Sequence, residues 1–346
     1  MARIKGGTTA MCKLPAGSAG LRILAAAIVL SLLVSLAAGP SPARADGRYQ
    51  AGVARITVPD AVPLVVLVAY PTDAAEAAFE SGPFTIRARR DAPIALAKAF
   101  PVLLFSHGNG RGGSPLNHRD LITALARQGF IVIAPFHAGT KPLRDRPRQL
   151  HEALDQVLAD QRFAAQVDRS RLGIVGYSFG GAVALIAAGA TPDWAHLVSY
   201  CRERTDDPRA CDGIDTNDTS HVIFGQAADV LPLKALVLME PFGAPFDREA
   251  LTALTMPVLL YRAEHSDLRP EGNILALAAA LPRSPKQESV PGGHLVFIDP
   301  CPPALEKEDP AACRDAADVD RVAIHRRIET EVADFFRDNL QARPHE

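Results

Sequence analysis

The sequence predicts a three-layer α/β/α sandwich with a mostly parallel central sheet. Short apolar runs such as FPVLLFSHG (100–108), FIVIAPF (130–136) and RLGIVGY (171–177) have the composition of buried strands. Helical patterns separate these runs, and the alternation indicates βαβ units. A glycine-rich corner, GYSFGG (176–181), joins the third run to a helical segment of small apolar residues. Ligands bind such sheets at the carboxyl ends of the strands, so we expect a site there.

The other elements continue this rhythm. Residues 51–70 alternate loosely and predict an N-terminal antiparallel pair of strands. Three later strands are expected at 233–240, 256–263 and 286–292. Four helices are expected at 114–129, 148–166, 271–281 and around 324–335. Ser114 is a suitable cap for the first of these helices and Gly129 a suitable end. In the last helix, Ile324, Ile328 and Val332 share one face.

The first 45 residues have the order of segments found in an export signal. A basic stretch precedes a continuous apolar run at 23–38, and an Ala-x-Ala pattern ends at Ala45. The apolar run has 16 residues, whereas a membrane-spanning helix needs roughly 20. We therefore expect cleavage near Ala45 and export to the periplasm or the medium. An uncleaved signal that anchors the chain is the alternative, and Met11 is an alternative start.

Composition limits the class of protein encoded after the leader. Residues 46–346 hold 32 basic and 39 acidic residues, a formal charge of −7. A mildly acidic surface argues against a nucleic-acid partner, which requires a basic stripe. No repeat, heptad or long linker is present, so we expect one domain over 46–346.

Four cysteines follow the leader. An even number in an exported chain indicates disulfides, and sequence proximity favours Cys201–Cys211 and Cys301–Cys313. Zinc binding is the alternative, but no Cys-x-x-Cys or clustered His spacing supports it. No metal and no cofactor is expected.

A long polar insertion at 191–230 interrupts the alternation of strands and helices. It follows the helix after the glycine-rich corner, so it either roofs the site or forms a surface loop closed by a disulfide. Trp194 is either a substrate contact or a small buried anchor. Four polar residues of the insertion could bind a calcium ion: Asp212, Asp215, Asn217 and Asp218. Their spacing matches no calcium-binding loop, so it favours an ordinary polar turn.

Gly176-Tyr177-Ser178-Phe179-Gly180 matches the Gly-x-Ser-x-Gly nucleophile elbow. A sharp strand-to-helix turn strains the serine backbone and leaves no room for neighbouring Cβ atoms, which explains the two glycines. The turn exposes the Ser178 hydroxyl and directs the Phe179 N–H at a developing oxyanion. The alternative is a plain glycine-rich corner, in which Ser178 has no chemical role.

The loop His107-Gly108-Asn109-Gly110 follows a buried strand directly. Its position predicts that the Asn109 N–H is the second oxyanion donor. We expect His107 to brace this loop rather than to transfer protons. His137 ends another strand and either lines the pocket or has a structural role.

A general base is expected near the end of the chain. His294, in the loop SVPGGHLVF, has the required order after Ser178. The acid that orients the imidazole must lie between the two, after a strand. We favour Asp267, with Glu240 after the preceding strand as the alternative and Glu264 third.

Together these motifs resemble the α/β-hydrolase superfamily. The phrases YPT, GPF, DAPIA, FPVLLFSHGNG and GYSFGG resemble the group of predicted dienelactone hydrolases, which is related to platelet-activating-factor acetylhydrolases. The resemblance covers about 50–340 and implies an α/β-hydrolase fold and a serine carboxylic-ester hydrolase without metal or cofactor. Authentic dienelactone hydrolases use a cysteine where this chain has Ser178. The acetylhydrolases imply Glu240 as the acid, whereas bacterial lipases and polyester hydrolases imply Asp267.

The sequence thus predicts an exported serine esterase acting on a small-molecule ester, with short-chain or small lipid-like esters favoured. A serine peptidase on the same fold is the nearest alternative, because a triad alone does not choose ester over amide. A non-catalytic binding protein that retains the fold is the alternative from another class.

Overall fold

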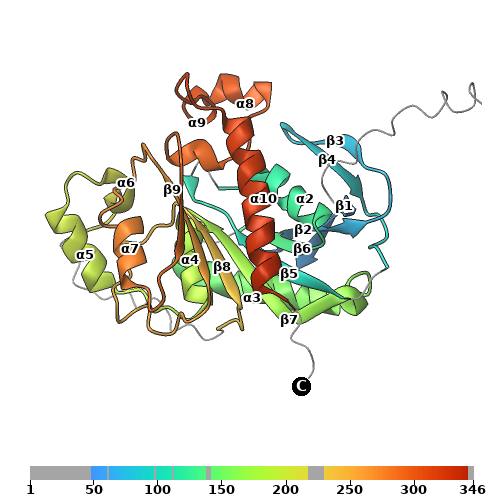
Figure 1. The fold of residues 1–346 in the computed structure, drawn as a ribbon, viewed down its shortest axis with the longest axis horizontal. Coiled ribbons are helices and arrows are strands. Elements are labelled where there is room, and N and C mark those ends of the chain that lie inside the picture. Colours follow the sequence, from blue (N-terminus) through green and yellow to red (C-terminus); the bar gives the residue numbers. More distant parts are fainter. Residues whose placement is uncertain are drawn as a thin grey trace, which may run out of the picture. The chain divides into compact units, whose positions relative to one another are not determined.

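One ten-stranded sheet, in the order β10-β9-β8-β7-β5-β6-β2-β1-β4-β3, forms the centre of the molecule (Figure 1). The computed structural model describes residues 48–60, 62–96, 99–110, 113–137, 142–216 and 230–341, and these belong to one compact unit. The strands are β1 (Gln50–Val58), β2 (Leu64–Thr72), β3 (Ala77–Ser81), β4 (Phe84–Arg90), β5 (Phe100–Ser106), β6 (Ile131–Pro135), β7 (Val167–Tyr177), β8 (Ala235–Met239), β9 (Val258–Ala263) and β10 (Lys286–Val290).

The sheet is parallel from β6 to β10. Pairs β6–β5, β5–β7, β7–β8, β8–β9 and β9–β10 are all parallel, whereas β2 is antiparallel to both β6 and β1. The predicted mostly parallel sheet and the N-terminal antiparallel pair are therefore confirmed. Because these strands are parallel, their carboxyl ends all lie at one edge of the sheet.

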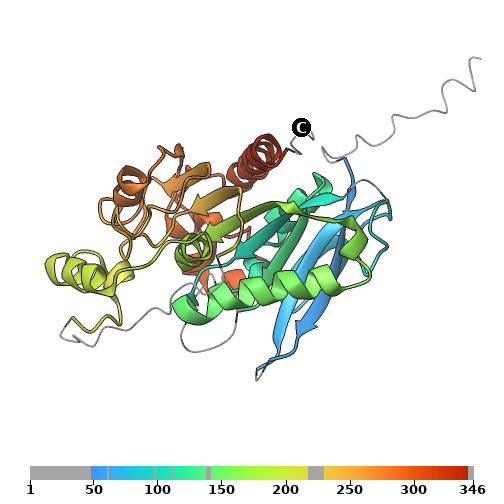
Figure 2. The ribbon, with the colours of Figure 1, turned by 90° about the horizontal axis from the view of Figure 1, so that it is seen from below.

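Helices cover both faces of the sheet (Figures 1 and 2). The helices are α2 (Arg119–Arg127), α3 (Pro142–Ala159), α4 (Phe179–Ala187), α5 (Trp194–Glu203), α6 (Pro208–Cys211), α7 (Ile274–Ala280), α8 (Pro303–Glu308), α9 (Pro310–Cys313) and α10 (Arg321–Asn339), and short 3-10 turns are η2 (Pro115–His118), η3 (Ala164–Gln166) and η4 (His294–Phe297). Side chains of α3, α4 and α7 pack in one core, and those of α2 and α10 pack in the other. This is the predicted α/β/α sandwich.

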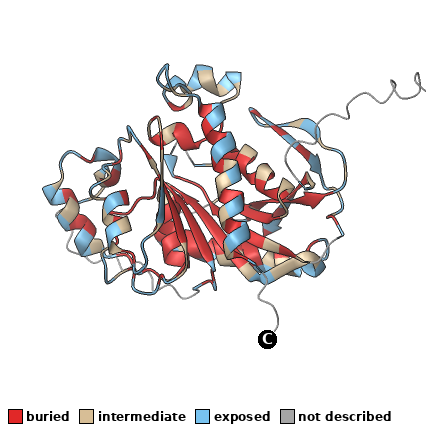
Figure 3. Cartoon of the chain, viewed as in Figure 1, coloured by how far each residue is buried: buried red, intermediate tan, exposed pale blue. Residues whose placement is uncertain are grey.

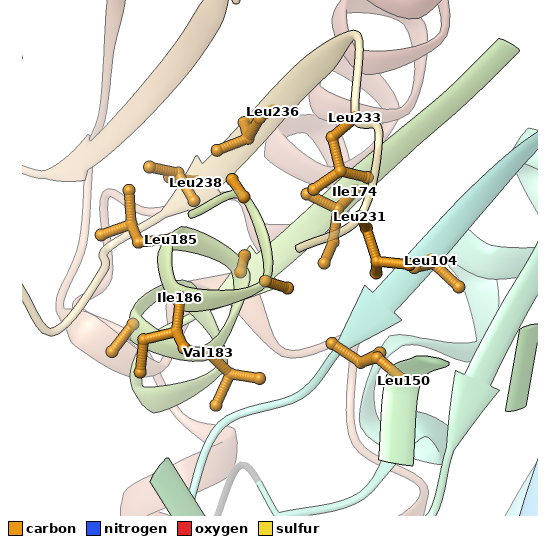
Figure 4. Close-up of a cluster of buried hydrophobic side chains, with 14 of the residues drawn as sticks. Leu104, Leu150, Ile174, Val183, Leu185, Ile186, Leu231, Leu233, Leu236 and Leu238 are labelled. Carbon is orange, nitrogen blue, oxygen red and sulfur yellow. The ribbon is translucent and has the colours of Figure 1, made fainter. Parts of the chain in front are cut away.

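Strand alternation produces these two cores. Leu236 and Leu238 of β8 enter the core beside α4, whereas Val237 and Met239 enter the core beside α10. Figure 4 shows the first of these cores, where Leu185 and other side chains of α4 meet the sheet. The central strands are buried along their length, and exposed residues lie on the outer faces of the helices (Figure 3). Burial on both sides explains the continuous apolar runs of the sequence.

Sequence reasoning missed the short helices α5, α6, α8 and α9, and it missed the β3–β4 hairpin. The sequence signal of the hairpin is weak. Burial alternates along the short strand FTIRARR, and a single glycine, Gly82 at φ +60°, lies in the turn before it. The two strands pair antiparallel, and β4 also pairs with β1, so the hairpin extends the sheet at its N-terminal end. It lies at the end of the sheet opposite β10.

Ser114 and Gly129 act as predicted in their helix. The Ser114 hydroxyl accepts a hydrogen bond from the Leu116 N–H at 3.1 Å, and Gly129 follows the helix at φ +96°. Within the described part of the chain, no helix has the length and apolar character needed to cross a membrane. The leader, including the apolar run at 23–38, Met11 and Ala45, lies outside the described residues.

Candidate active site

Ser178 occupies a strained corner between β7 and α4. Its backbone has φ 53° and ψ −119°, and it is one of few non-glycine residues with positive φ among those described. Its N–H donates to the Met239 carbonyl at 2.9 Å, and its carbonyl accepts from Gly181 at 2.9 Å. Fixed strain of this kind is typical of functional turns, because the surrounding structure must hold it.

The elbow glycines are required by space. A Cβ on Gly180 would lie 2.0 Å from the Ser106 carbonyl oxygen, and one on Gly176 would lie 2.5 Å from the Gly180 carbonyl oxygen. Neither carbonyl can move without disturbing β5 or α4. The close approach brings the loop after β5 against the start of α4, so two segments distant in sequence meet beside Ser178.

His294 lies within hydrogen-bond distance of Ser178. Its Nε2 is 2.9 Å from the Ser178 Oγ, on the η4 turn that follows β10. The Tyr177 hydroxyl donates to the His294 carbonyl at 3.0 Å, and the two rings lie 5.4 Å apart. Tyr177, the residue before the serine, therefore holds the loop that carries the histidine.

Burial keeps the His294 imidazole neutral. Loss of solvent lowers the pKa of His294 well below its usual value, the nearby Arg209 guanidinium lowers it further, and Asp267 opposes both. A neutral imidazole can accept the serine proton, so the residue is in the state that a general base needs. Its Nδ1 is buried and has no hydrogen-bond partner among the described residues.

Glu240 lies next to the elbow and is fully buried. Met239 pairs with Tyr177 in the parallel β7–β8 register, so Glu240 and Ser178 follow adjacent strands directly. Glu240 has φ 48°, and its Oε2 accepts from the Ala263 N–H at 3.2 Å. Its Oε1 is buried and lacks a hydrogen-bond partner among the described residues. Burial raises the pKa of Glu240 to about 7, against the lowering effects of Ser266 and Ala263.

Asp267 is in a different state. Its side chain is 59% exposed, and both carboxylate oxygens accept from the guanidinium of Arg209 on α6. Burial raises the pKa of Asp267, but the hydrogen bonds and charge of Arg209 outweigh it, so the pKa stays below its usual value. Asp267 and His294 line one cavity of about 300 Å³. Glu264 is exposed at the end of β9 and accepts from the Ser289 hydroxyl at 3.4 Å.

The loop after β5 is held by buried polar contacts. His107 Nδ1 lies 2.8 Å from the Gly108 carbonyl, and burial, reinforced by Arg146, lowers the pKa of His107 to about 3. His137 contacts the Ser106 hydroxyl at 3.1 Å and Gln149 at 3.0 Å. Both histidines brace β5 and its loop. Asn109 is exposed, and Phe179 provides the first N–H of α4, which has no acceptor within its own helix.

The insertion reaches the rim of the site. Its helices α5 and α6 are joined by the Cys201–Cys211 disulfide, and Arg209 of α6 lines the cavity beside His294. The second disulfide joins Cys301 to Cys313, so both pairings match those favoured from sequence. Trp194 is partly buried at the start of α5 and packs against the core beside α4.

The suggested calcium clip is only partly within the described residues. Asn217 and Asp218 lie outside them, whereas Asp212 and Asp215 follow α6. In the described part of the chain, no cluster of three or more His, Cys, Asp or Glu residues is arranged to hold a metal ion.

Two arginines near the site were missed from the sequence. Arg209 meets Asp267 across 58 residues of chain, and Arg146 of α3 contacts the loop after β5 across 37 to 39 residues. Nothing local distinguishes either from an ordinary surface arginine. Only the partners that folding brings to each arginine, together with the burial of Arg146, reveal them.

The sheet order, the flanking helices and the elbow together define the class of fold: the chain has an α/β-hydrolase fold, as its sequence resemblance implies. A ferulic acid esterase from Streptomyces cinnamoneus is similar in structure, with a TM-score of 0.55 and 18% identity over 88% of this chain and 94% of that chain. A dienelactone hydrolase from Anabaena variabilis is similar at a TM-score of 0.44 and 16% identity, over 85% of this chain and 100% of that one.

A family model is more specific. The model described as PETase, PET hydrolase-like, matches residues 119–205. The matched segment includes Ser178 but neither His294 nor the candidate acids. A search of curated proteins found no match. The matched family and the ferulic acid esterase are both hydrolases.

Proposed function

We propose that this protein is a serine carboxylic-ester hydrolase with Ser178 as nucleophile and His294 as general base. The observation that carries the proposal is the 2.9 Å contact between His294 Nε2 and the hydroxyl of a serine held at φ 53° on a strand-to-helix elbow. A hydroxyl next to a neutral imidazole can lose its proton as it attacks a carbonyl carbon. The hydrolase family match over residues 119–205 supports the same class of reaction.

Glu240 is the acid in this proposal. Its Oε1 and the Nδ1 of His294 are both buried and both without a partner among the described residues. A carboxylate oxygen accepts and an imidazole Nδ1–H donates, so the two atoms are chemically complementary. The oxygens of Asp267 are already held by Arg209. This choice differs from our first expectation from the sequence, which favoured Asp267.

The reaction then has two halves. Ser178 Oγ attacks the ester carbonyl while His294 takes its proton, and the N–H groups of Phe179 and Asn109 stabilise the oxyanion. His294 returns the proton to the leaving alcohol. Water, deprotonated by His294, attacks the acyl-enzyme, releases the acid and restores Ser178.

The test is hydrolysis of p-nitrophenyl acetate, butyrate and octanoate by residues 46–346. Wild-type activity that falls by about 10⁴-fold or more in Ser178→Ala supports the proposal. Activity that Ser178→Ala retains, or a wild type without activity on any of the esters, contradicts it. The ratio among the three chain lengths gives the size of the acyl pocket.

We also propose that the protein is exported. Two disulfides support this, because disulfides persist in oxidising compartments. The mass of the protein recovered from the periplasm of a bacterial host tests it. Loss of residues 1–45 is expected, and an intact leader would indicate the anchored alternative.

A further inference from the structure

We propose that Arg146 is a positioning residue of the oxyanion hole, which clamps the Asn109 loop to the elbow and supplies a fixed positive charge there. The inference rests on the proposed esterase function and concerns a residue outside the nucleophile, base and acid. It starts from the contacts of one side chain on α3.

Arg146 bridges the two segments that carry the oxyanion donors. One terminal nitrogen donates to the carbonyls of His107 and Gly108, at 3.0 and 3.3 Å, and the other donates to Asn109 Oδ1 at 3.3 Å. Its guanidinium carbon lies 5.3 Å from the centre of the Phe179 ring. A planar, multiply donating guanidinium can make all these contacts at once, and a lysine ammonium cannot.

The charge of Arg146 is buried without a carboxylate. The residue is 6% exposed, yet no acidic side chain pairs with it in the part of the chain that the structure describes. Arg119 and Arg321 are similarly buried, and each pairs with an aspartate. Burying an arginine without a counter-charge is costly, so structures keep one only where it has a use.

The groups around Arg146 do not cancel its charge. His107 and His137 are both neutral. Burial first and Arg146 second lower the pKa of His107 to about 3, and burial, reinforced by His107 and Arg146, lowers the pKa of His137 well below its usual value. The neighbouring acceptors are carbonyls and one amide. A net positive charge therefore remains behind the carbonyls of the loop after β5 and next to the Phe179 ring, close to the elbow where a tetrahedral intermediate would place negative charge.

Positioning explains why the clamp matters for rate. The Asn109 loop follows β5 and is exposed at its tip, so it needs a contact that fixes its distance from the elbow. A displacement of about 1 Å at a catalytic group can cost about 100-fold in rate. Removing Arg146 should weaken stabilisation of the transition state and leave substrate binding little changed.

The experiment compares Arg146→Met and Arg146→Lys with the matched control Arg127→Met. Arg127 also donates hydrogen bonds to a backbone carbonyl, that of Arg87 at 2.9 Å, and to a carboxylate, that of Glu76 at 2.8 Å. It lies at the end of α2 that leads into the start of β6, away from the site. For each variant we would measure kcat and KM on p-nitrophenyl butyrate, and the inhibition constant of phenylboronic acid. The boron atom of phenylboronic acid bonds to the Ser178 oxygen, and the tetrahedral anion that results imitates the transition state.

For Arg146→Met we expect kcat to fall about 30- to 100-fold with KM within about threefold, and boronic acid affinity to fall in parallel. Arg146→Lys, which keeps the charge but not the bridge, should lie between this variant and the wild type. Arg127→Met should lower the melting temperature and leave both constants unchanged. Melting curves show whether each variant folds. If Arg146→Met does not fold, the constants of Arg146→Lys alone test the inference.

Three outcomes overturn the inference. They are an increase in KM with unchanged kcat, a fall in kcat that boronic acid affinity does not follow, and wild-type constants in a folded Arg146→Lys and Arg146→Met. Failure of the esterase proposal is separate, because it would appear as an inactive wild type or an active Ser178→Ala whatever happens at Arg146.

Discussion

The loops after β8 and β9 each present a carboxylate at the carboxyl edge of the sheet, but the surroundings of the two carboxylates are opposite in kind. Glu240 is fully buried, lies in a strained backbone conformation and leaves one oxygen without a partner among the described residues. Asp267 is 59% exposed, and Arg209 occupies both its oxygens. A buried and unsatisfied carboxylate is costly, so its retention indicates use. An exposed ion pair has a small desolvation penalty, and this one joins the insertion to the loop after β9.

The two loops are nevertheless connected. Asn273, before α7, is fully buried and accepts from the N–H groups of Gly243 and Ala244 in the loop after β8. Its amide donates to Asp207 of the insertion at 2.9 Å. The insertion is thus fixed to the fold by Asn273 on one side and by the Arg209–Asp267 pair on the other. In the proposed mechanism the loop after β8 carries the catalytic acid, whereas the loop after β9 anchors the insertion.

The largest expected effect separates the two carboxylates directly. Glu240→Gln should lower kcat by about 10³- to 10⁴-fold, because an amide cannot stabilise the imidazolium that forms during catalysis. Asp267→Asn should lower kcat by less than about tenfold. Steady-state kinetics on p-nitrophenyl butyrate, with circular dichroism to verify folding, make the comparison. The reverse order of effects would identify Asp267 as the acid.

The pH dependence should identify the same residue. Since burial raises the pKa of Glu240 to about 7, the carboxylate needed for catalysis is lost as the pH falls below about 7. We expect kcat/KM to rise about tenfold per pH unit up to that value and then to level off. The low pKa of His294 places no second limb in this range. The limb should remain in Asp267→Asn and vanish in Glu240→Gln. A limb that survives in Glu240→Gln would assign it to another group.

Removing the Cys201–Cys211 disulfide of the insertion should affect stability more than catalysis. The double variant Cys201→Ala/Cys211→Ala opens a loop closed over 10 residues of sequence separation. We expect the free energy of unfolding to fall by roughly 2–3 kcal/mol and kcat to stay within about threefold. Chemical denaturation measures the first quantity, and Cys301→Ala/Cys313→Ala serves as the matched control. A loss of activity as large as that of Glu240→Gln would give the insertion a catalytic part.

The smallest effect is expected at Arg209. The pair with Asp267 is partly exposed, so Arg209→Gln should change stability by at most about 1 kcal/mol. It should change kcat less than threefold. Loss of the guanidinium also removes a charge that lowers the pKa of His294, which should therefore rise. NMR titration of the His294 ring measures this shift, and Arg209→Lys, which keeps the charge, should show less of it.

The sequence by itself determined the layered fold, the order of the strands along the chain and the elbow at Ser178. These depend on local signals: continuous apolar runs specify buried strands, and only glycines fit at 176 and 180. It also indicated His294, which the fold brings to 2.9 Å from the Ser178 hydroxyl. The β3–β4 hairpin was not predicted, because the alternation of apolar and polar residues along its strands is short and its turn contains one glycine.

Only the tertiary structure decided how the carboxylates differ and which arginines approach the site. Asp267 and Glu240 both follow strands in the right order, and nothing in the adjoining residues tells that one is buried and the other held by Arg209. Arg146 and Arg209 acquire their partners across 37 or more residues of chain. Burial and charge pairing are properties of atoms brought together by folding, and they cannot be read from residue spacing alone.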